Sequence, residues 1–362
     1  MRLAIVGTGL IGASAGLAAD RAGFASVAGW DEDPGVLEVA AERGAVTPAE
    51  SLEAALHEAE LVFVAVPVAS VPAVVHEVLA LAPADATVTD AGSTKASVCQ
   101  AAGDDPRFVG GHPICGAEAR GPARASTDLF EGATWFLTPL PTTEPARYRA
   151  AHAFAAALGA RPLAIDPGTH DRLVAVTSHL PHALANVLLN QAGSSRIDGH
   201  DPLSAAGGSL RDMTRVAGAN PRIWVDIFLD NRVALAQALA EHRRRVEQLE
   251  KALGDGDAGF LARWIGEASE NRREMLDTAY EDAGALHRLR VHVPDRPGVL
   301  AGIFQALGAE RLNVNDFELE HLSSDRGGTL TILVTGENEA AQATRLLEAQ
   351  GYSVVAAPVL DE

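Results

Sequence analysis

The sequence predicts an α/β protein in three parts: a Rossmann-type doubly wound sheet, an all-α segment and a small ferredoxin-like βαββαβ module. Residues 1–167 alternate short β-branched runs with alanine-rich helical stretches. Residues 168–284 show helical periodicity without strand signals, and strands return in residues 287–362. Such alternation is typical of a mostly parallel sheet with helices on both faces, so we expect residues 1–167 to form the nucleotide-binding part.

Composition is that of an ordinary globular protein of 362 residues, long enough for about two or three domains. The formal net charge of −19 argues against binding to nucleic acid or to an anionic membrane surface. Cys99 and Cys115 form no motif with metal-ligand spacing, so we expect no metal site and a reducing, cytoplasmic setting. No apolar run reaches the roughly 18 residues that span a bilayer.

The predicted elements follow from local periodicity. Strands are expected at 2–6, 26–30, 61–66, 86–90, 107–111, 134–139 and 161–166, with helices that include 48–58, 70–81 and 145–158. Residues 223–253 are predicted to form one long helix of the kind that pairs across a dimer, with a break at 254–259 and a further helix to about 278. The last part is expected to run strand, helix, two strands, helix, strand from residue 287.

A dinucleotide-binding fingerprint opens the chain. In "LAIVGTGLIGASAG", Gly7, Gly9 and Gly12 fit G-x-G-x-x-G between a strand and a helix. The helix then begins with Leu10 and Ile11. The N-terminus of a helix presents backbone amides and the positive end of the helix dipole to phosphates. Asp31 follows the second strand, where a carboxylate binds a ribose diol and repels a 2′-phosphate. The motif therefore predicts NAD rather than NADP.

Two further segments end strands at the expected nicotinamide crevice. "FVAVPVASV" ends its strand at Pro67, and "TDAGSTKASV" places Thr94 at the start of a helix. We expect both residues near the cofactor. A hydroxyl at Thr94 is equally suited to capping that helix.

"GGHPICGAE" sets His112 between two glycines and a proline at a strand end. A histidine held in this way is a candidate general base, and the alternative is a loop histidine packed against the strand. Ser93 follows a neighbouring strand end. Its hydroxyl, bonded to one imidazole nitrogen, would leave the other nitrogen free for substrate.

Histidine and arginine residues recur in the helical segment. "SHLPHAL" contains His179 and His182, and "GGSLRDMTRVAGANPRIWVDIF" contains Arg215 and Trp224. Such a cluster opposite a nucleotide site suits a dianionic small-molecule substrate. The histidines are also compatible with a purely structural role at a helix start.

Together these motifs resemble the prephenate/arogenate dehydrogenase family. "VGTGLIGAS", "TDAGSTK", "GGHPICGAE", "VTSHLPHALA", "GGSLRDMTRVA" and "IWVDIFLDN" occur in that family's order over essentially the whole chain. The tail "VPDRPGVLAGIFQAL" resembles an ACT regulatory domain. The resemblance implies a helical dimerisation domain, a homodimer and NAD-dependent oxidative decarboxylation of prephenate in tyrosine biosynthesis.

The resemblance also implies roles for individual residues. His112 matches the catalytic histidine, Ser93 the serine that orients it, and Arg215 the arginine that binds a substrate carboxylate. His182 and Glu118 match residues that line the substrate pocket. Trp224 and His179 are expected at the same pocket, although for Trp224 a packing role is equally suited.

The ACT-like tail implies an effector site. Gly298 lies in the turn after the first strand, and Asn313 and Asn315 lie on the next segment. Such modules usually pair and hold an amino acid between two copies, and tyrosine, the end product, is the expected effector. A purely structural dimerising tail is the alternative.

Three other functions remain open at this stage. An arogenate dehydrogenase would be favoured if Glu118 faces the substrate side chain, where arogenate carries an ammonium group. A β-hydroxyacid dehydrogenase would need a catalytic lysine, which "PGTHDRLVAVTSH" lacks at the start of the helical segment. A non-enzymatic NAD and amino-acid sensor is disfavoured by the intact set of Ser93, His112 and Arg215.

Overall fold

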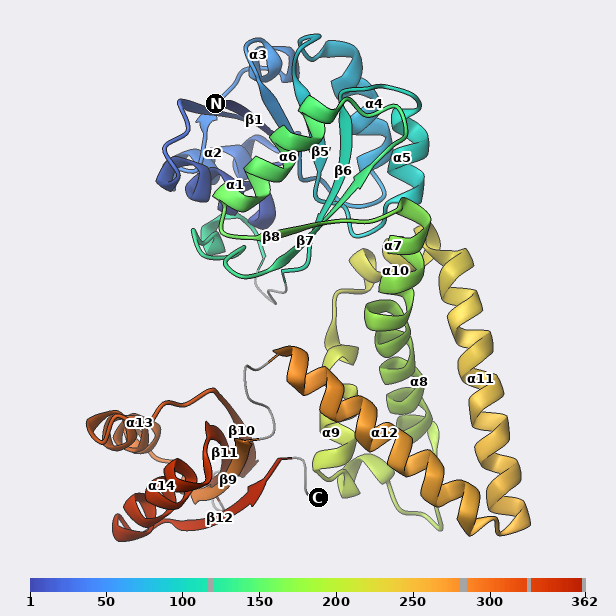
Figure 1. Ribbon diagram of the computed structural model, residues 1–362, viewed down its shortest axis with the longest axis vertical. Coiled ribbons are helices and arrows are strands. Elements are labelled where there is room, and N and C mark those ends of the chain that lie inside the picture. Colours follow the sequence, from blue (N-terminus) through green and yellow to red (C-terminus); the bar gives the residue numbers. More distant parts are fainter. Residues whose placement is uncertain (116–119, 280–284, 324–326, 360–362) are drawn as a thin grey trace. The chain divides into compact units, whose positions relative to one another are not determined.

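The computed structural model describes residues 1–115, 120–279, 285–323 and 327–359. By their internal contacts these residues form two compact units, Met1–Arg243 and Arg244–Glu362, which are described separately (Figure 1). The division between the units falls inside a long helix. The boundaries expected at 167 and 284 remain predictions.

The first unit contains an eight-stranded sheet in the order β3-β2-β1-β4-β5-β6-β7-β8. Neighbouring strands are parallel except β6 and β7, which are antiparallel. All seven predicted strands are present, and β3 is an additional two-residue strand. The strands are β1 (Arg2–Val6), β2 (Ser26–Trp30), β3 (Thr47–Pro48), β4 (Leu61–Val64), β5 (Thr87–Asp90), β6 (Phe108–Pro113), β7 (Thr134–Pro139) and β8 (Arg161–Ala164).

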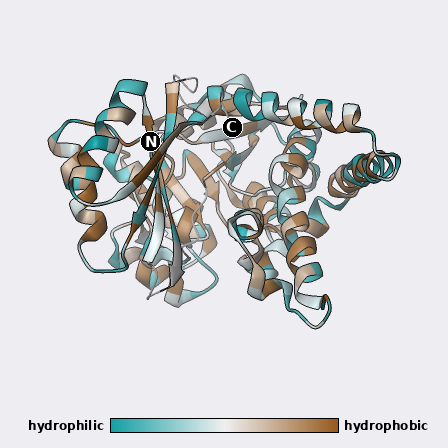
Figure 2. Cartoon of the chain, turned by 90° about the horizontal axis from the view of Figure 1, so that it is seen from below, coloured by the Kyte–Doolittle hydropathy of each residue, from teal (hydrophilic) through white to brown (hydrophobic). Residues whose placement is uncertain are grey.

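Helices cover both faces of this sheet, because side chains alternate along each strand. On β1, Leu3 and Ile5 join one core cluster with α1 and α6, whereas Ala4 and Val6 join another with α3, α4 and α5. Hydrophobic residues accordingly run along the strands and the helices that pack on them (Figure 2). The helices are α1 (Leu10–Arg21), α2 (Pro34–Glu42), α3 (Leu52–Leu56), α4 (Val71–Leu81), α5 (Ala96–Ala102) and α6 (Pro145–Ala157).

A helical segment follows the sheet, and it corrects one prediction. Residues 223–253 do not form one helix, because α10 ends at Asp230 and α11 begins at Arg232. Asn231, between them, is buried and donates its side-chain amide to the Asp171 carbonyl at 2.8 Å. The helices of this segment are α7 (Pro167–Val174), α8 (Leu180–Ser194), α9 (Gly208–Thr214), α10 (Pro221–Asp230) and α11 (Arg232–Asp255), with a π-helical turn at Ala175–His179 and short 3-10 turns at Pro122–Arg124, Pro202–Ala205 and Arg215–Gly218.

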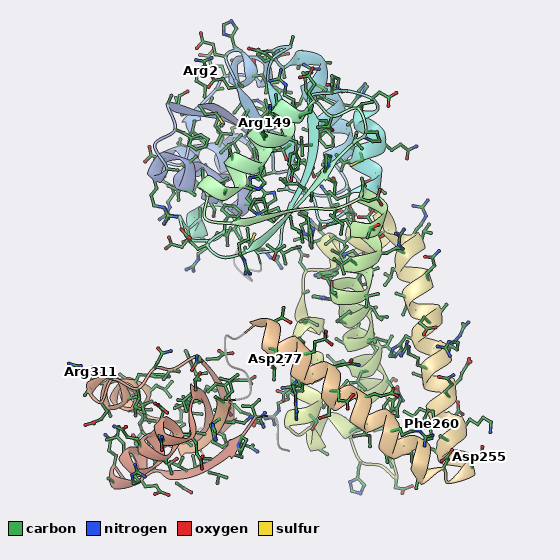
Figure 3. The ribbon with its side chains drawn as sticks, in the orientation of Figure 1. Arg2, Arg149, Asp255, Phe260, Asp277 and Arg311 are labelled. Carbon is green, nitrogen blue, oxygen red and sulfur yellow. The ribbon has the colours of Figure 1, made fainter. Side chains whose placement is uncertain are left out.

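The second unit begins within α11 and contains α12 (Ala258–Ala279). A short turn separates the end of α11 at Asp255 from the start of α12, which contains Phe260 (Figure 3). Its four-stranded antiparallel sheet has the order β10-β11-β9-β12. The chain order is the predicted βαββαβ: β9 (Leu286–Val293), α13 (Val299–Ala309), β10 (Asp316–Ser323), β11 (Gly327–Thr335), α14 (Glu337–Ala349) and β12 (Ser353–Pro358). In the part of the chain that is described, no helix has the length and apolar character needed to cross a membrane.

Candidate active site

The glycines of the fingerprint are required by close packing. Gly7 has φ +89°, and a Cβ there would lie 2.6 Å from the Ala65 carbonyl oxygen. A Cβ on Gly12 would lie 1.9 Å from the Gly7 carbonyl oxygen, whereas one on Gly9 would meet open space. Among the described residues no side chain caps α1 at Gly9. The first amides of α1 are therefore available to an anion.

Asp31 lies directly after β2, beside the end of β1. The Thr8 amide and hydroxyl donate to its Oδ2 at 2.6 and 3.2 Å, and the Asp33 amide donates to its Oδ1 at 3.0 Å. The carboxylate is thus held at the strand ends next to the glycine turn. Pro67, predicted near the cofactor, is exposed just after β4.

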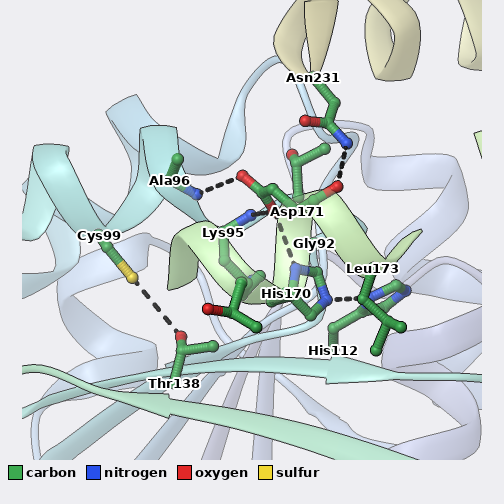
Figure 4. A network of polar contacts seen from close by, with 12 residues as sticks. Gly92, Lys95, Ala96, Cys99, His112, Thr138, His170, Asp171, Leu173 and Asn231 are labelled. Carbon is green, nitrogen blue, oxygen red and sulfur yellow. Dashed lines mark hydrogen bonds and ion pairs between the residues drawn. The ribbon is translucent and has the colours of Figure 1, made fainter. Parts of the chain in front are cut away.

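His112 lies on β6 and is held through a chain of imidazole and carboxylate groups (Figure 4). Its Nδ1 lies 2.8 Å from Nε2 of His170, and Nδ1 of His170 lies 2.8 Å from Oδ1 of Asp171. His170 and Asp171 are buried at the start of α7, while His112 is partly exposed. Asp171 also accepts the amides of Lys95 and Ala96 at 2.8 and 2.9 Å, and so caps the N-terminus of α5.

A buried ion pair fixes the backbone next to His112. Lys95 and Asp90, both fully buried, are paired through Nζ and Oδ2. Lys95 Nζ also donates to the Gly111 carbonyl at 2.6 Å, and Asp90 Oδ1 accepts the Gly111 amide at 2.9 Å. A Cβ on Gly111 would lie 2.4 Å from the Asp90 carbonyl oxygen, which explains the glycine before His112.

The electrostatic environment keeps His112 neutral. Burial of the ring lowers its pKa well below the ordinary value, and its electrostatic interactions with His170, Lys95 and His179 act in the same direction. Burial likewise lowers the pKa of His179 to about 4. For Asp171 burial acts against the charged form, but hydrogen bonds from His170 and two backbone amides outweigh it and lower the pKa of the carboxyl.

A second group of residues lies near His112 and consists of His179, His182, Trp224 and Arg215. His179 interacts electrostatically with His112, and Arg215 does so with His182. Nδ1 of His179 lies 3.1 Å from the amide nitrogen of Asn231, which places the ring proton of neutral His179 on Nε2. The His182 ring stacks on Trp224 with centroids 3.5 Å apart, and the His179 ring meets Trp224 edge-on at 6.1 Å. Burial lowers the pKa of His182, and the charge of Arg215 lowers it further. The arrangement offers a neutral base, an N–H donor and a cation.

Comparison with known proteins identifies the family. Residues 15–163 match the family model described as the nucleotide-binding domain of prephenate dehydrogenase, 166–267 match its dimerization domain, and 287–352 match the ACT domain. The chain is 32% identical to a cyclohexadienyl dehydrogenase of Zymomonas mobilis over 77% of this chain and 97% of the relative. It belongs to the prephenate dehydrogenase family.

The chain is also similar to other members of the prephenate dehydrogenase family, one of them in sequence over a greater length and one in structure. A prephenate dehydrogenase of Bacillus subtilis is 29% identical over 96% of this chain and 95% of its own length. The crystal structure of prephenate dehydrogenase from A. aeolicus, in complex with hydroxyphenyl propionate and NAD+, has a TM-score of 0.71 and 28% identity. It covers 76% of this chain and 98% of that one. The resemblance, the fold class and the order of the parts are confirmed.

Ser93 and Thr94 were predicted at the base and at the cofactor, and the structure gives their surroundings. Ser93 lies in the turn between β5 and α5, and within the described residues it makes no hydrogen bond to His112, whose Nδ1 contacts His170 instead. The orienting role of Ser93 therefore stays a prediction. The Thr94 hydroxyl donates to Asp230 Oδ2 at 2.5 Å, so it contacts α10. Its place near the cofactor stays a prediction. Glu118 lies outside the described residues.

The sequence analysis missed His170, Asp171, Asn231 and the pair Asp90–Lys95. A signal was present for the first two, because "THD" follows the last strand of the sheet and starts a helix that faces the strand ends. None was available for Asn231, which lies in the middle of an apolar helical pattern. In the described part of the chain, no cluster of three or more His, Cys, Asp or Glu residues is arranged to hold a metal ion.

The predicted effector residues lie in the second unit. Gly298 has φ +88° and precedes α13, where a Cβ would meet open space. Asn313 is exposed, and the side-chain oxygen of Asn315 accepts the Thr335 hydroxyl at 3.1 Å. Their role in binding an effector stays a prediction.

Proposed function

We propose that the chain is an NAD-dependent prephenate dehydrogenase that oxidatively decarboxylates prephenate to 4-hydroxyphenylpyruvate in tyrosine biosynthesis. The names of its relatives in Bacillus subtilis and A. aeolicus support this substrate. The observation that carries the proposal is the gathering of neutral His112 with the His179, His182 and Arg215 cluster in one unit that also contains the glycine fingerprint.

The residues at the fingerprint fit NAD. Gly9 leaves open space before the uncapped start of α1, which suits a pyrophosphate, and Leu10 and Ile11 supply the first amides. Asp31 is held beside them for the ribose hydroxyls. When bound, NAD supplies the acceptor for the hydride that leaves the substrate ring.

The side chains supply base, charge and orientation. His112 accepts the proton of the ring hydroxyl, so that C=O character develops at the carbon that loses hydride. Arg215 binds a substrate carboxylate through charge-assisted hydrogen bonds, and His179 donates from Nε2. His182 and Trp224 form a flat wall for the ring. The ring carboxylate leaves as CO2, and the aromatic product makes the step strongly favourable.

The Asp31→Ser variant is expected to bind NAD about 10- to 100-fold more weakly, because a charge-assisted hydrogen bond to the ribose is lost. The variant is also expected to bind NADP more tightly than the wild type does, since the carboxylate that repels a 2′-phosphate is removed. Fluorescence titration with both nucleotides measures the two dissociation constants. Asp33→Ser, which alters the cap of α2, is the control. An unchanged NAD-to-NADP ratio in Asp31→Ser would contradict the assignment.

The acid limb of kcat/KM is expected below the ordinary histidine pKa of about 6.5. Activity needs neutral His112, whose pKa is lowered by burial and by His170, Lys95 and His179, so activity persists to lower pH and is lost as His112 takes up a proton. The groups facing His112 also include Asp171, which acts through His170. A pH profile of kcat/KM from pH 4.5 to 9 tests this, and half-loss at or above pH 6.5 would contradict it.

Arogenate is the alternative substrate, because the Zymomonas mobilis relative is named for the broader cyclohexadienyl class. Purified enzyme is assayed for NADH formation with prephenate and arogenate side by side. Higher kcat/KM with prephenate supports the proposal, higher kcat/KM with arogenate replaces the substrate, and no NADH with either rejects the dehydrogenase function.

We further propose a homodimer with tyrosine as a feedback effector bound at the ACT domain near Gly298, Asn313 and Asn315. The match to a dimerization domain supports pairing, as do large exposed apolar side chains on α10 and α11. These are Ile223, Val225, Leu229 and Val233. Sedimentation tests the dimer, and the prephenate assay repeated with tyrosine tests the effector.

A further inference from the structure

The neighbours of His112 suggest a role for a residue that the sequence analysis did not single out. His170 is fully buried between His112 and Asp171, and both of its ring nitrogens are engaged. Its ring also packs edge-on against Phe136 of β7, with centroids 5.4 Å apart. The orientation of His170 is therefore determined by β7, α7 and two polar partners.

The direction of each hydrogen bond follows from Asp171. Its carboxylate accepts the amides of Lys95 and Ala96, which fixes it as an acceptor. His170 must then donate from Nδ1, and a neutral imidazole that donates from Nδ1 carries its lone pair on Nε2. His112 meets that lone pair with Nδ1, so Nδ1 of His112 carries the proton. The lone pair of His112 is left on Nε2.

We propose that His170, held by Asp171, is the positioning residue that sets the tautomer of His112 and so makes Nε2 the atom that accepts the substrate proton. This inference rests on the proposed function of His112 as general base. In the proton transfer, the substrate O–H bond breaks, a new N–H bond forms at Nε2, and the Nδ1 proton stays on His112. The Asp171 carboxylate supplies a countercharge to the resulting imidazolium through His170.

The assignment differs from one in which Ser93 orients the base. Ser93 lies in the turn before α5, whereas His170 lies in α7, in the helical segment that also contains His179. His170, His179 and His182 therefore belong to the same helical segment. The placement couples the tautomer of the base to the packing of α7 against β7.

Activity of two variants tests the role of His170. His170→Phe keeps an aromatic ring against Phe136 but has no acceptor for the Nδ1 proton, and kcat is expected to fall about 10²-fold, within the range that a general base contributes. KM for prephenate and the Kd of NAD are expected to change little. His170→Gln offers a carbonyl oxygen as acceptor and is expected to recover part of kcat. Equal kcat in wild type and His170→Phe, or equal loss in both variants, would overturn the proposal.

A measurement that does not depend on turnover separates this inference from the proposed function. Nitrogen-15 NMR of histidine-labelled wild-type enzyme, assigned with His112→Asn, reports which ring nitrogen of His112 is protonated. A proton on Nδ1 above the acid limb is expected, with a mixture of tautomers in His170→Phe. A proton on Nε2 in the wild type would overturn the relay whether or not the variants fold. If His112→Asn retains full turnover, the base assignment fails instead.

Discussion

Replacing His112 by asparagine is expected to lower kcat for prephenate oxidation by about 10²- to 10⁴-fold, the usual contribution of a general base. The amide of asparagine has no basic nitrogen to accept the hydroxyl proton at neutral pH. KM and the Kd of NAD are expected to stay within a few-fold of wild type, because proton transfer is an interaction of the transition state. Steady-state kinetics at pH 8 with NADH absorbance measures the split.

An exposed histidine provides the matched control for this prediction. His152 lies on the outer side of α6, and His152→Asn is expected to leave both kcat and KM unchanged. The acid limb of the pH profile should also vanish from the residual activity of His112→Asn, since the titrating ring is gone. Undiminished turnover in His112→Asn would reject His112 as the base.

The fold could be predicted because its signals are local. Strand β1 alternates side chains toward two buried faces, and the contact that requires glycine at 12 is with the Gly7 carbonyl, five residues earlier. The contact that requires glycine at 7 is with the distant Ala65, but the short fingerprint motif already marks that position. The missed strand β3 has only two residues, too few for a period to show. The break at Asn231 is a tertiary effect, because its side chain donates to α7 and the following turn instead of extending a helix.

The candidate site was predictable only in part, because some of its contacts join residues that are far apart in the sequence. His112 could be found from its rigid glycine and proline neighbours, and Arg215 from the resemblance. The partner of His112 lies 58 residues away in sequence, and its contact depends on how α7 packs against β6 and β7. Periodicity in one segment carries no information on such a pairing. The sequence analysis therefore expected only Ser93 beside His112, and it did not predict the contact of His112 Nδ1 with His170.

The second large effect is expected from Lys95→Met, which should lower the free energy of unfolding by about 3–5 kcal/mol. Methionine matches the length of the stem but removes the ammonium group, and the carboxylate of Asp90 is then buried without its cation. The backbone of Gly111 also loses its hydrogen bond from Lys95, directly before His112. Urea unfolding followed by tryptophan fluorescence measures the change, since Trp30, Trp135 and Trp224 lie in the same unit.

A double variant decides whether the loss comes from the unpaired charge. The double variant of Lys95→Met and Asp90→Asn removes both charges. Its loss of unfolding free energy is expected to be smaller than the sum of the losses in the two single variants. The chain's other lysine gives the control: Lys251 pairs with Asp255 on the exposed surface of α11, and Lys251→Met is expected to change stability little. The explanation would be wrong if the losses of unfolding free energy from Lys95→Met and Asp90→Asn simply add in the double variant. It would also be wrong if Lys95→Met and Lys251→Met lose the same unfolding free energy.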